Sequence, residues 1–224
     1  MAYRRFAIYY APPAEHPLGR FGAAWLGWDA ASGVEVAHPD LGLDAARLTA
    51  TPRKYGFHGT LKPPMRLVGT PEAFEDAARA LAADVAAFEM PPLTLRAIGP
   101  FLALVPAEPS RALAALAARC VMELDQFRAP PSEAELAKRR QQQLSPAQEA
   151  LLARWGYPKV LEEFRFPLTR TGALEAGDLA RATEALAPAL EAPLAEPLPV
   201  REICLFGEAK DGRFHIVTRL PLAG

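Results

Sequence analysis

The sequence predicts an α+β protein in which two similar lobes, each with an antiparallel sheet, flank a central cleft. A strand, a helix and two more strands follow one another twice, about 109 residues apart, so that Thr60 corresponds to Thr169. A repeated supersecondary unit indicates internal duplication, and each sheet buries one face under its helices. The stretch between the repeats has three helical patterns. We expect one bilobed domain over 1–224, with lobe 1 at about 1–108, a helical insertion at about 109–160 and lobe 2 at about 161–224.

The first repeat places each element by its apolar pattern and its end signals. Thr70-Pro71-Glu72 opens a helix, because threonine caps the first turn, proline fits the first helical position and an acid suits the helix start. The expected elements are a strand at 6–10, a helix at 18–28, a strand around His58 that ends at Pro63-Pro64, a helix from 70 to about 88, and strands at 93–98 and 101–105.

The insertion and the second repeat have equally clear signals. Pro109-Ser110 starts one helix that reaches about Phe127, and Ser132 with Glu135 forms a capping-box pattern for the next. Ser145 with Gln148 repeats that pattern for a third helix, which ends near Trp155. The second repeat is expected as a strand at 164–171, a helix at 176–190 and strands at 200–206 and 214–220.

The composition is ordinary for a soluble globular protein, since half of the residues are hydrophobic and the formal net charge is −1. A near-neutral chain without a basic stripe is not expected to bind long nucleic acid. Cys120 and Cys204 lie far apart in apolar surroundings, which favours buried thiols over a disulfide or a metal site. The sequence has no long apolar run and no signal-like N-terminus, so we expect a cytoplasmic protein without a membrane span. It gives no indication of oligomeric state.

The run from 55 to 64 carries the most chemistry. Side chains at alternate strand positions share a face, so His58, Thr60 and Lys62 are expected to line one surface. An imidazole, a hydroxyl and a cation side by side suit a phosphate ester. In the second repeat the same alternation groups 165, 167, 169 and 171, and it turns Arg170 toward the helix layer. A buried arginine there is costly without a partner.

These runs, together with the duplication, resemble the two-histidine (2H) phosphoesterase superfamily, in which each lobe offers His-x-Thr or His-x-Ser. The chain is most similar to an uncharacterised bacterial branch that is tied to phosphonate-utilisation operons. Members of that branch have a histidine in the second motif, where this chain has Pro167, and a leucine where it has Arg170. The matching runs are 11–13, 21–27, 53–64, 127–130, 154–158, 162–166 and 204–206.

The resemblance implies a cyclic phosphodiesterase that needs no metal or other cofactor and acts on a small phosphorylated metabolite, with a ribosyl phosphate as the favoured class. Two opposed histidines would take and give the protons of ring opening. Proline has no group that transfers protons, so Pro167 puts the activity in doubt. The implied catalytic residues are His58, Thr60 and Thr169, and the implied substrate-binding residues are Lys62, Arg165, Thr171 and Arg128.

Two alternatives remain open on the sequence. One is a catalytically silent protein on the same fold, which binds a phosphate metabolite or docks to a partner; the other is an RNA-processing role. The basic run 138–143 is interpreted as a solvated helix end, with a phosphate-contacting patch as the alternative, and Arg139 is a further candidate anion ligand. One of Tyr9 and Tyr10 is expected to face the cleft. His215 is interpreted as structural.

Overall fold

In the computed structural model, which describes residues 2–141 and 143–224, antiparallel strands form a seven-stranded main sheet. Its order is β11-β10-β1-β4-β8-β7-β6. The predicted α+β class with antiparallel pairing is confirmed. The strands are β1 (Phe6–Tyr10), β4 (Gly59–Met65), β6 (Leu93–Ile98), β7 (Phe101–Pro106), β8 (Leu168–Thr169), β10 (Glu202–Glu208) and β11 (Phe214–Pro221).

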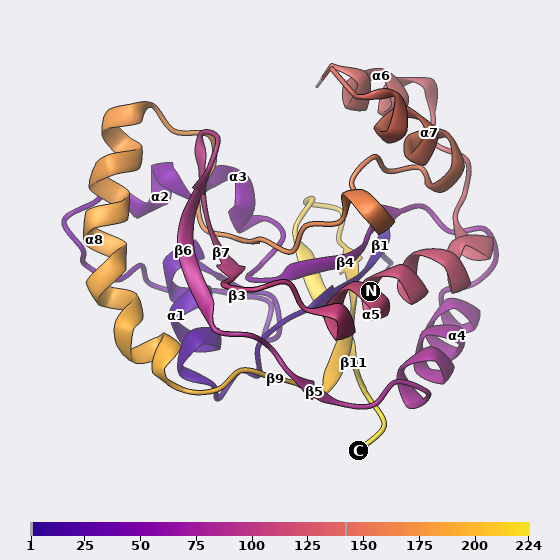
Figure 1. The fold of residues 1–224 in the computed structure, drawn as a ribbon, viewed down its shortest axis with the longest axis horizontal. Coiled ribbons are helices and arrows are strands. Elements are labelled where there is room, and N and C mark those ends of the chain that lie inside the picture. The colour runs from indigo at the N-terminus through magenta and orange to yellow at the C-terminus, as the bar shows by residue number, and fades with distance from the viewer. Residues whose placement is uncertain (1, 142) are drawn as a thin grey trace.

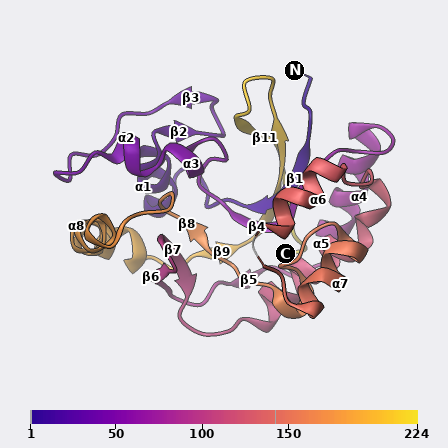
Figure 2. The same ribbon diagram turned by 90° about the horizontal axis from the view of Figure 1, so that it is seen from above.

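Helices cover the sheet in two groups (Figures 1 and 2). On one side α8 lies beside the β6–β7 hairpin and packs on α1; on the other, α4 packs on β10 and β11 and α5 packs on β4. Both views place α6 and α7 on the side of α4 and α5. The longer helices are α1 (Pro17–Leu26), α4 (Pro71–Ala83), α5 (Arg111–Glu123), α6 (Glu133–Arg140), α7 (Pro146–Trp155) and α8 (Ala176–Ala195). The short elements are α2 (Ala45–Leu48), α3 (Ala50–Arg53), β2 (Trp28–Asp29), β3 (Val34–Glu35), β5 (Phe88–Glu89), β9 (Pro199–Val200) and the 3-10 turns η1 (Asp125–Phe127) and η2 (Leu161–Glu163).

The strand order interleaves the two repeats. β1 of the first repeat pairs with β10 of the second, and β7 of the first pairs with β8 of the second. The expected lobes, 1–108 and 161–224, therefore each contribute strands to both halves of the sheet. The halves meet where β4 and β8 pair through Gly59 and Leu168.

The helix starts agree with the sequence signals. The hydroxyls of Thr70, Ser110, Ser132 and Ser145 each accept a hydrogen bond from the backbone N–H three residues on, and the last two complete capping boxes. These predictions succeed because capping depends on a few neighbouring residues.

Several ends differ from expectation. α1 stops at Leu26 rather than at 28, because Trp28 belongs to β2, and α5 stops at Glu123 rather than near Phe127. α4 stops at Ala83 rather than near 88, since Phe88–Glu89 pairs with Pro199–Val200 as a short second sheet. α8 runs on past 190 to Ala195. The strand expected at 164–171 is reduced to Leu168–Thr169, and Pro167, directly before it, has no N–H to offer a ladder.

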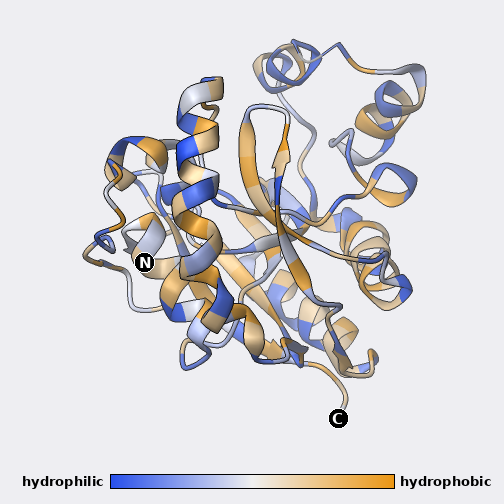
Figure 3. Cartoon of the chain, turned by 60° about the vertical axis from the view of Figure 1, so that its left-hand side comes forward, coloured by the Kyte–Doolittle hydropathy of each residue, from blue (hydrophilic) through white to orange (hydrophobic). Residues whose placement is uncertain are grey.

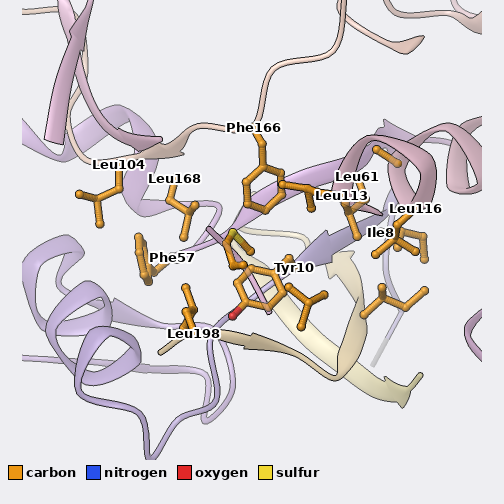
Figure 4. Packing of buried hydrophobic residues seen from close by; sticks show 14 of the residues in the cluster. Ile8, Tyr10, Phe57, Leu61, Leu104, Leu113, Leu116, Phe166, Leu168 and Leu198 are labelled. Atoms are coloured by element: carbon orange, nitrogen blue, oxygen red, sulfur yellow. The ribbon is translucent and has the colours of Figure 1, made fainter. Parts of the chain in front are cut away.

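The core lies mainly between the sheet and the helices. On β1, Ile8 and Tyr10 face the helices, whereas Tyr9 faces the opposite side with Phe206 and Phe214. Figure 4 shows Ile8 and Tyr10 within a cluster that also includes Leu61, Phe166 and Leu168. In α8 the residues Ala182, Leu186 and Leu190 are buried at every fourth position, and Figure 3 shows hydrophilic residues on its other side.

Candidate functional site

A cavity of roughly 410 Å³ lies where β4 and β8 meet, on the sheet face that Tyr9 occupies. Its volume suits a small molecule. The lining residues on the two strands and their extensions include His58, Thr60, Thr169 and Thr171, together with Pro63 and Pro64. Other lining residues come from α6 and from the segment after α7, which bring Arg139 and Tyr157 to the same space.

The hydrogen bonds of His58 fix the state of its imidazole. Nδ1 lies 2.9 Å from the carbonyl oxygen of Gly56, which can only accept, so Nδ1 carries the proton and donates it. Nε2 is then unprotonated and lies 3.4 Å from Oγ1 of Thr60. Burial lowers the pKa of His58 to about 4, although one edge of the ring stays open to the cavity. At neutral pH the ring is a neutral base.

Tyr9 holds the imidazole in place. The two rings stack with centroids 3.8 Å apart and planes inclined by 21°. Tyr10 points the other way, and its hydroxyl donates to the carbonyl oxygen of Pro199 at 3.2 Å. The tyrosine expected to face the cleft is therefore Tyr9.

Lys62 does not share a face with Thr60, and that expectation is wrong. Thr60 pairs with Tyr9 but Lys62 pairs with Ile8, so the register shifts at Leu61 and the strand reverses its facing there. Lys62 is 2% exposed beneath α5, where Nζ donates to the carbonyl oxygen of Val121 at 2.9 Å and lies 3.3 Å from Oδ1 of Asp125. It anchors a helix and does not line the cavity.

The register between β4 and β8 relates the two motifs by an approximate two-fold axis. Gly59 pairs with Leu168, so continuing the ladder by one residue in each direction sets His58 opposite Thr169 and Thr60 opposite Pro167. Residues 58 and 167 are diagonal neighbours, whose Cα atoms are typically about 7–8 Å apart in an antiparallel pair. Pro167 thus corresponds to His58 in the sequence motif, two residues before the threonine, but it is not among the residues that line the cavity.

Thr171 shares the cavity wall with Thr169, but its hydroxyl is already engaged. The side chain is fully buried, and Oγ1 accepts a hydrogen bond from the backbone N–H of Leu102 at 2.9 Å. Since a hydroxyl can accept from one group and donate to another, it can still donate to a ligand.

Two other predicted ligands lie elsewhere. Arg165 is exposed, does not line the cavity, and donates to the carbonyl oxygen of Phe164. Arg128 forms a two-pronged pair with Asp125, at 2.7 and 2.9 Å, and donates to the carbonyl oxygen of Arg154 at 3.0 Å. It joins the end of α5 to the end of α7, so its place in the matching run reflects this clamp.

Arg170 faces the helix layer, as strand alternation predicts. Its side chain is fully buried, and its guanidinium lies 4.0 Å from the ring centroid of Phe57. Within residues 2–141 and 143–224, none of its three side-chain nitrogens has a hydrogen-bond partner. Burial lowers the pKa of Arg170 to about 9, so the group still carries its charge at pH 7.

Other lining residues had weak or no sequence signals. Tyr55 and Tyr157 fall within runs that match the 2H branch, whereas nothing marks Arg5, which pairs with Glu208 beside the cavity. In the basic run, Lys138 and Arg139 line the cavity and Arg140 pairs with Glu149, so a solvated helix end describes only part of it. Gln142 of this run lies outside the described residues.

The described part of the chain holds neither a metal-binding cluster nor a membrane-spanning helix. There, no group of three or more His, Cys, Asp or Glu side chains is placed to hold a metal ion. None of the helices so described combines the length and the apolarity needed to cross a bilayer.

Residues 60–215 match the model of a family described as "Protein of unknown function (DUF1045)". The chain belongs to this family. The match includes Thr60, the insertion and the second motif, and the resemblance to 2H phosphoesterases is confirmed at this level. What Pro167 does to the activity stays a prediction.

Two relatives of this DUF1045 chain are named "Ribose 1,5-bisphosphate phosphokinase PhnN". The protein from Janthinobacterium sp. (strain Marseille) is 40% identical over 183 residues, which are 78% of this chain and 40% of that protein. The protein from Laribacter hongkongensis (strain HLHK9) is 34% identical over 223 residues, 96% of this chain and 51% of that protein. The chain therefore spans about half the length of these relatives.

Solved structures similar to the chain include E. coli LigT complexed with 3′-AMP, at 15% identity and a TM-score of 0.47. E. coli LigT complexed with phosphate matches at 16% identity and 0.46, and a structure described as a phosphoesterase matches at 17% and 0.44. Each match covers the whole of both chains.

Proposed function

We propose that the cavity binds a small cyclic or nucleotide-like phosphate ester, as a 2H-type phosphodiesterase does, and that His58 acts on it as a general base. One observation carries the proposal: His58 donates its only ring proton to Gly56 and presents an unprotonated Nε2 beside Thr60 at the cavity. The names of the PhnN relatives support a link to phosphonate metabolism and a ribosyl phosphate as the ligand.

Ring opening of a cyclic phosphate requires a base, groups that bind the phosphoryl oxygens and a proton donor for the leaving oxygen. A water oxygen attacks phosphorus while one ester P–O bond breaks; the water proton passes to Nε2 of His58, and the leaving oxygen must gain a proton. The hydroxyls of Thr60 and Thr169 can donate to the phosphoryl oxygens. Pro167 cannot supply the second proton, so it must come from solvent. The absence of one positioned proton donor typically slows such reactions about 100- to 10,000-fold.

The second candidate is a catalytically silent protein that binds a phosphate metabolite or docks to a partner on the same fold. Pro167 favours it, because this residue stands where a proton donor would mirror His58. A silent protein that binds the metabolite differs from the enzyme only in turnover, whereas a protein that docks to a partner need not bind the ester.

The test compares hydrolysis of 2′,3′-cyclic AMP by the parent chain, Pro167→His and the double variant His58→Gln with Pro167→His. Pro167→His is expected to hydrolyse the ester about 100- to 10,000-fold faster than the parent, because it restores a proton donor opposite the base. The double variant is expected to lose that gain. Arg165→Gln, which lies two residues away and outside the cavity, is the matched control.

Calorimetric titration of the same ester separates the possible results. Binding without turnover in the parent, and fast turnover in Pro167→His, supports a retained cleft with a disabled catalyst. If the ester neither binds to nor is hydrolysed by either protein at millimolar concentration, the proposed function is wrong.

A further inference from the structure

The charges of the cavity come from the helical segment and not from the motif strands. Lys138 and Arg139 reach the cavity from α6, and Lys159 reaches it from the segment after α7. The motif strands contribute a neutral imidazole and hydroxyl groups. A dianionic ligand would therefore meet its counter-charges on the side formed by the helical segment.

These cations are unpaired within the described part of the chain. None of the three side chains forms a salt bridge or a side-chain hydrogen bond with another described residue. Nε of Arg139 is buried without a partner, while the guanidinium carbon lies 4.7 Å from the ring centroid of Tyr157. A buried donor that the protein leaves unsatisfied is costly unless a ligand accepts its hydrogen bond.

The other charged residues around the cavity are already paired. Arg5 is paired with Glu208. Glu135 also lines the cavity, but its carboxylate already accepts hydrogen bonds from the backbone N–H of Ser132 at 2.7 Å and from Arg66 at 3.3 Å. The contrast leaves three cations free to attract an anion.

The element that presents Lys138 and Arg139 is fixed in position. A capping box starts α6, and the Arg66–Glu135 pair ties its first turn to the residue after β4. Tyr157 packs under the guanidinium of Arg139 and orients it. These contacts hold Arg139 in place, whereas Lys138 and Lys159 are exposed beside it at the cavity.

We propose that Lys138, Arg139 and Lys159 form a second anion subsite, which binds a phosphomonoester on the same ligand whose cyclic phosphate lies at His58 and Thr60. The subsite deepens the proposed function and presupposes it. The ligand class is a sugar phosphate with two phosphoryl groups, one in a cyclic diester and one free.

Two ligands that differ by one group test the subsite: 2′,3′-cyclic AMP and its 5′-phosphate, titrated calorimetrically into the parent chain at 0.1 M salt. The 5′-phosphate is expected to tighten binding at least about tenfold, the effect of one charge-assisted hydrogen bond. In the variant Lys138→Gln with Arg139→Gln, the ratio of the two dissociation constants is expected to fall below about three. Arg140→Gln, on the same helix but paired with Glu149, is the control and keeps the parent ratio.

The outcomes distinguish this subsite from the proposed function. If both ligands bind equally well to the parent, the subsite is overturned while the proposed function stands; if neither binds, the proposed function fails first. A high ratio that persists in the double variant also overturns the subsite. If the double variant unfolds, Lys159→Gln provides the test instead, because Lys159 lies outside the helices. This single substitution must then lower the ratio of the two dissociation constants.

Discussion

Two residues at mirrored positions determine what this cavity can do. His58 presents an unprotonated Nε2 because its one ring proton lies on Nδ1, which donates to the carbonyl oxygen of Gly56, and the stacked ring of Tyr9 keeps the imidazole at the cavity. Pro167, directly before β8, is the corresponding residue of the second motif and has no group that exchanges a proton. The site therefore has a base without its matching acid, which a histidine at 167 would supply.

Arg170 is the residue whose replacement should most improve stability. Its charged guanidinium is fully buried, and among the described residues it has only the rings of Phe57 and Phe21 beside it. Arg170→Leu is expected to raise the free energy of unfolding by about 1–4 kcal/mol, since an apolar side chain removes the desolvation penalty. The change is measured as a rise in the midpoint of urea unfolding relative to the parent, with the m-value unchanged.

Arg165→Leu serves as the control for this change because it lies in the same segment and is exposed. Its free energy of unfolding is expected to stay within about 0.5 kcal/mol of the parent value. A lower midpoint for Arg170→Leu would mean that the aromatic contacts outweigh the cost of burying the charge.

At the scale of elements, Lys62 links α5 to the sheet. Its Nζ donates to the carbonyl oxygen of Val121, in the last turn of α5, where carbonyls lack helical partners. Burial lowers the pKa of Lys62, and Asp125 opposes that shift. Lys62→Met keeps the apolar stem but leaves Val121 unsatisfied, so we expect a loss of about 2 kcal/mol of stability.

Ligand affinity should change less than twofold in Lys62→Met, since Lys62 faces away from the cavity. Chemical denaturation and calorimetry with 2′,3′-cyclic AMP measure the two quantities, and Lys210→Met, at an exposed turn, is the control. A tenfold loss of affinity with unchanged stability would mean that Lys62 contacts the bound phosphate. It would then contradict the reversal of facing at Leu61.

Local signals explain which elements could be predicted. Caps such as Ser132 with Glu135 act over three residues, so the helix starts follow from the sequence. The shift at Leu61 depends on pairing with β1, about fifty residues away, and strand alternation alone places Lys62 on the wrong face. β8 is short because Pro167 has no N–H to donate to the ladder. The run from 164 to 171 is long enough for a full strand, so its length does not indicate this.

At the scale of the whole molecule, the cavity forms where distant segments meet. The duplication predicts two motifs around a cleft, but the interleaved order of β1, β4, β8 and β10 requires knowledge of long-range pairing. The same limit hides Arg5 and Lys159, and it leaves the basic run that contains Lys138 undecided between a solvated helix end and a phosphate-contacting patch. The resemblance to the family identifies the two motifs, whereas the placement of the cations at the cavity depends on the tertiary structure.

The most direct test of this site, which has a base without its matching acid, is a pH titration of His58. The titration is monitored by ¹⁵N NMR of its imidazole between pH 3.5 and 8. We expect a neutral ring with the proton on Nδ1 down to about pH 4, because burial disfavours the charged form and shifts its pKa below the ordinary value. His58→Gln identifies the resonances. An ordinary titration near pH 6.5, or a proton on Nε2 at pH 7, would contradict the assignment of His58 as the general base.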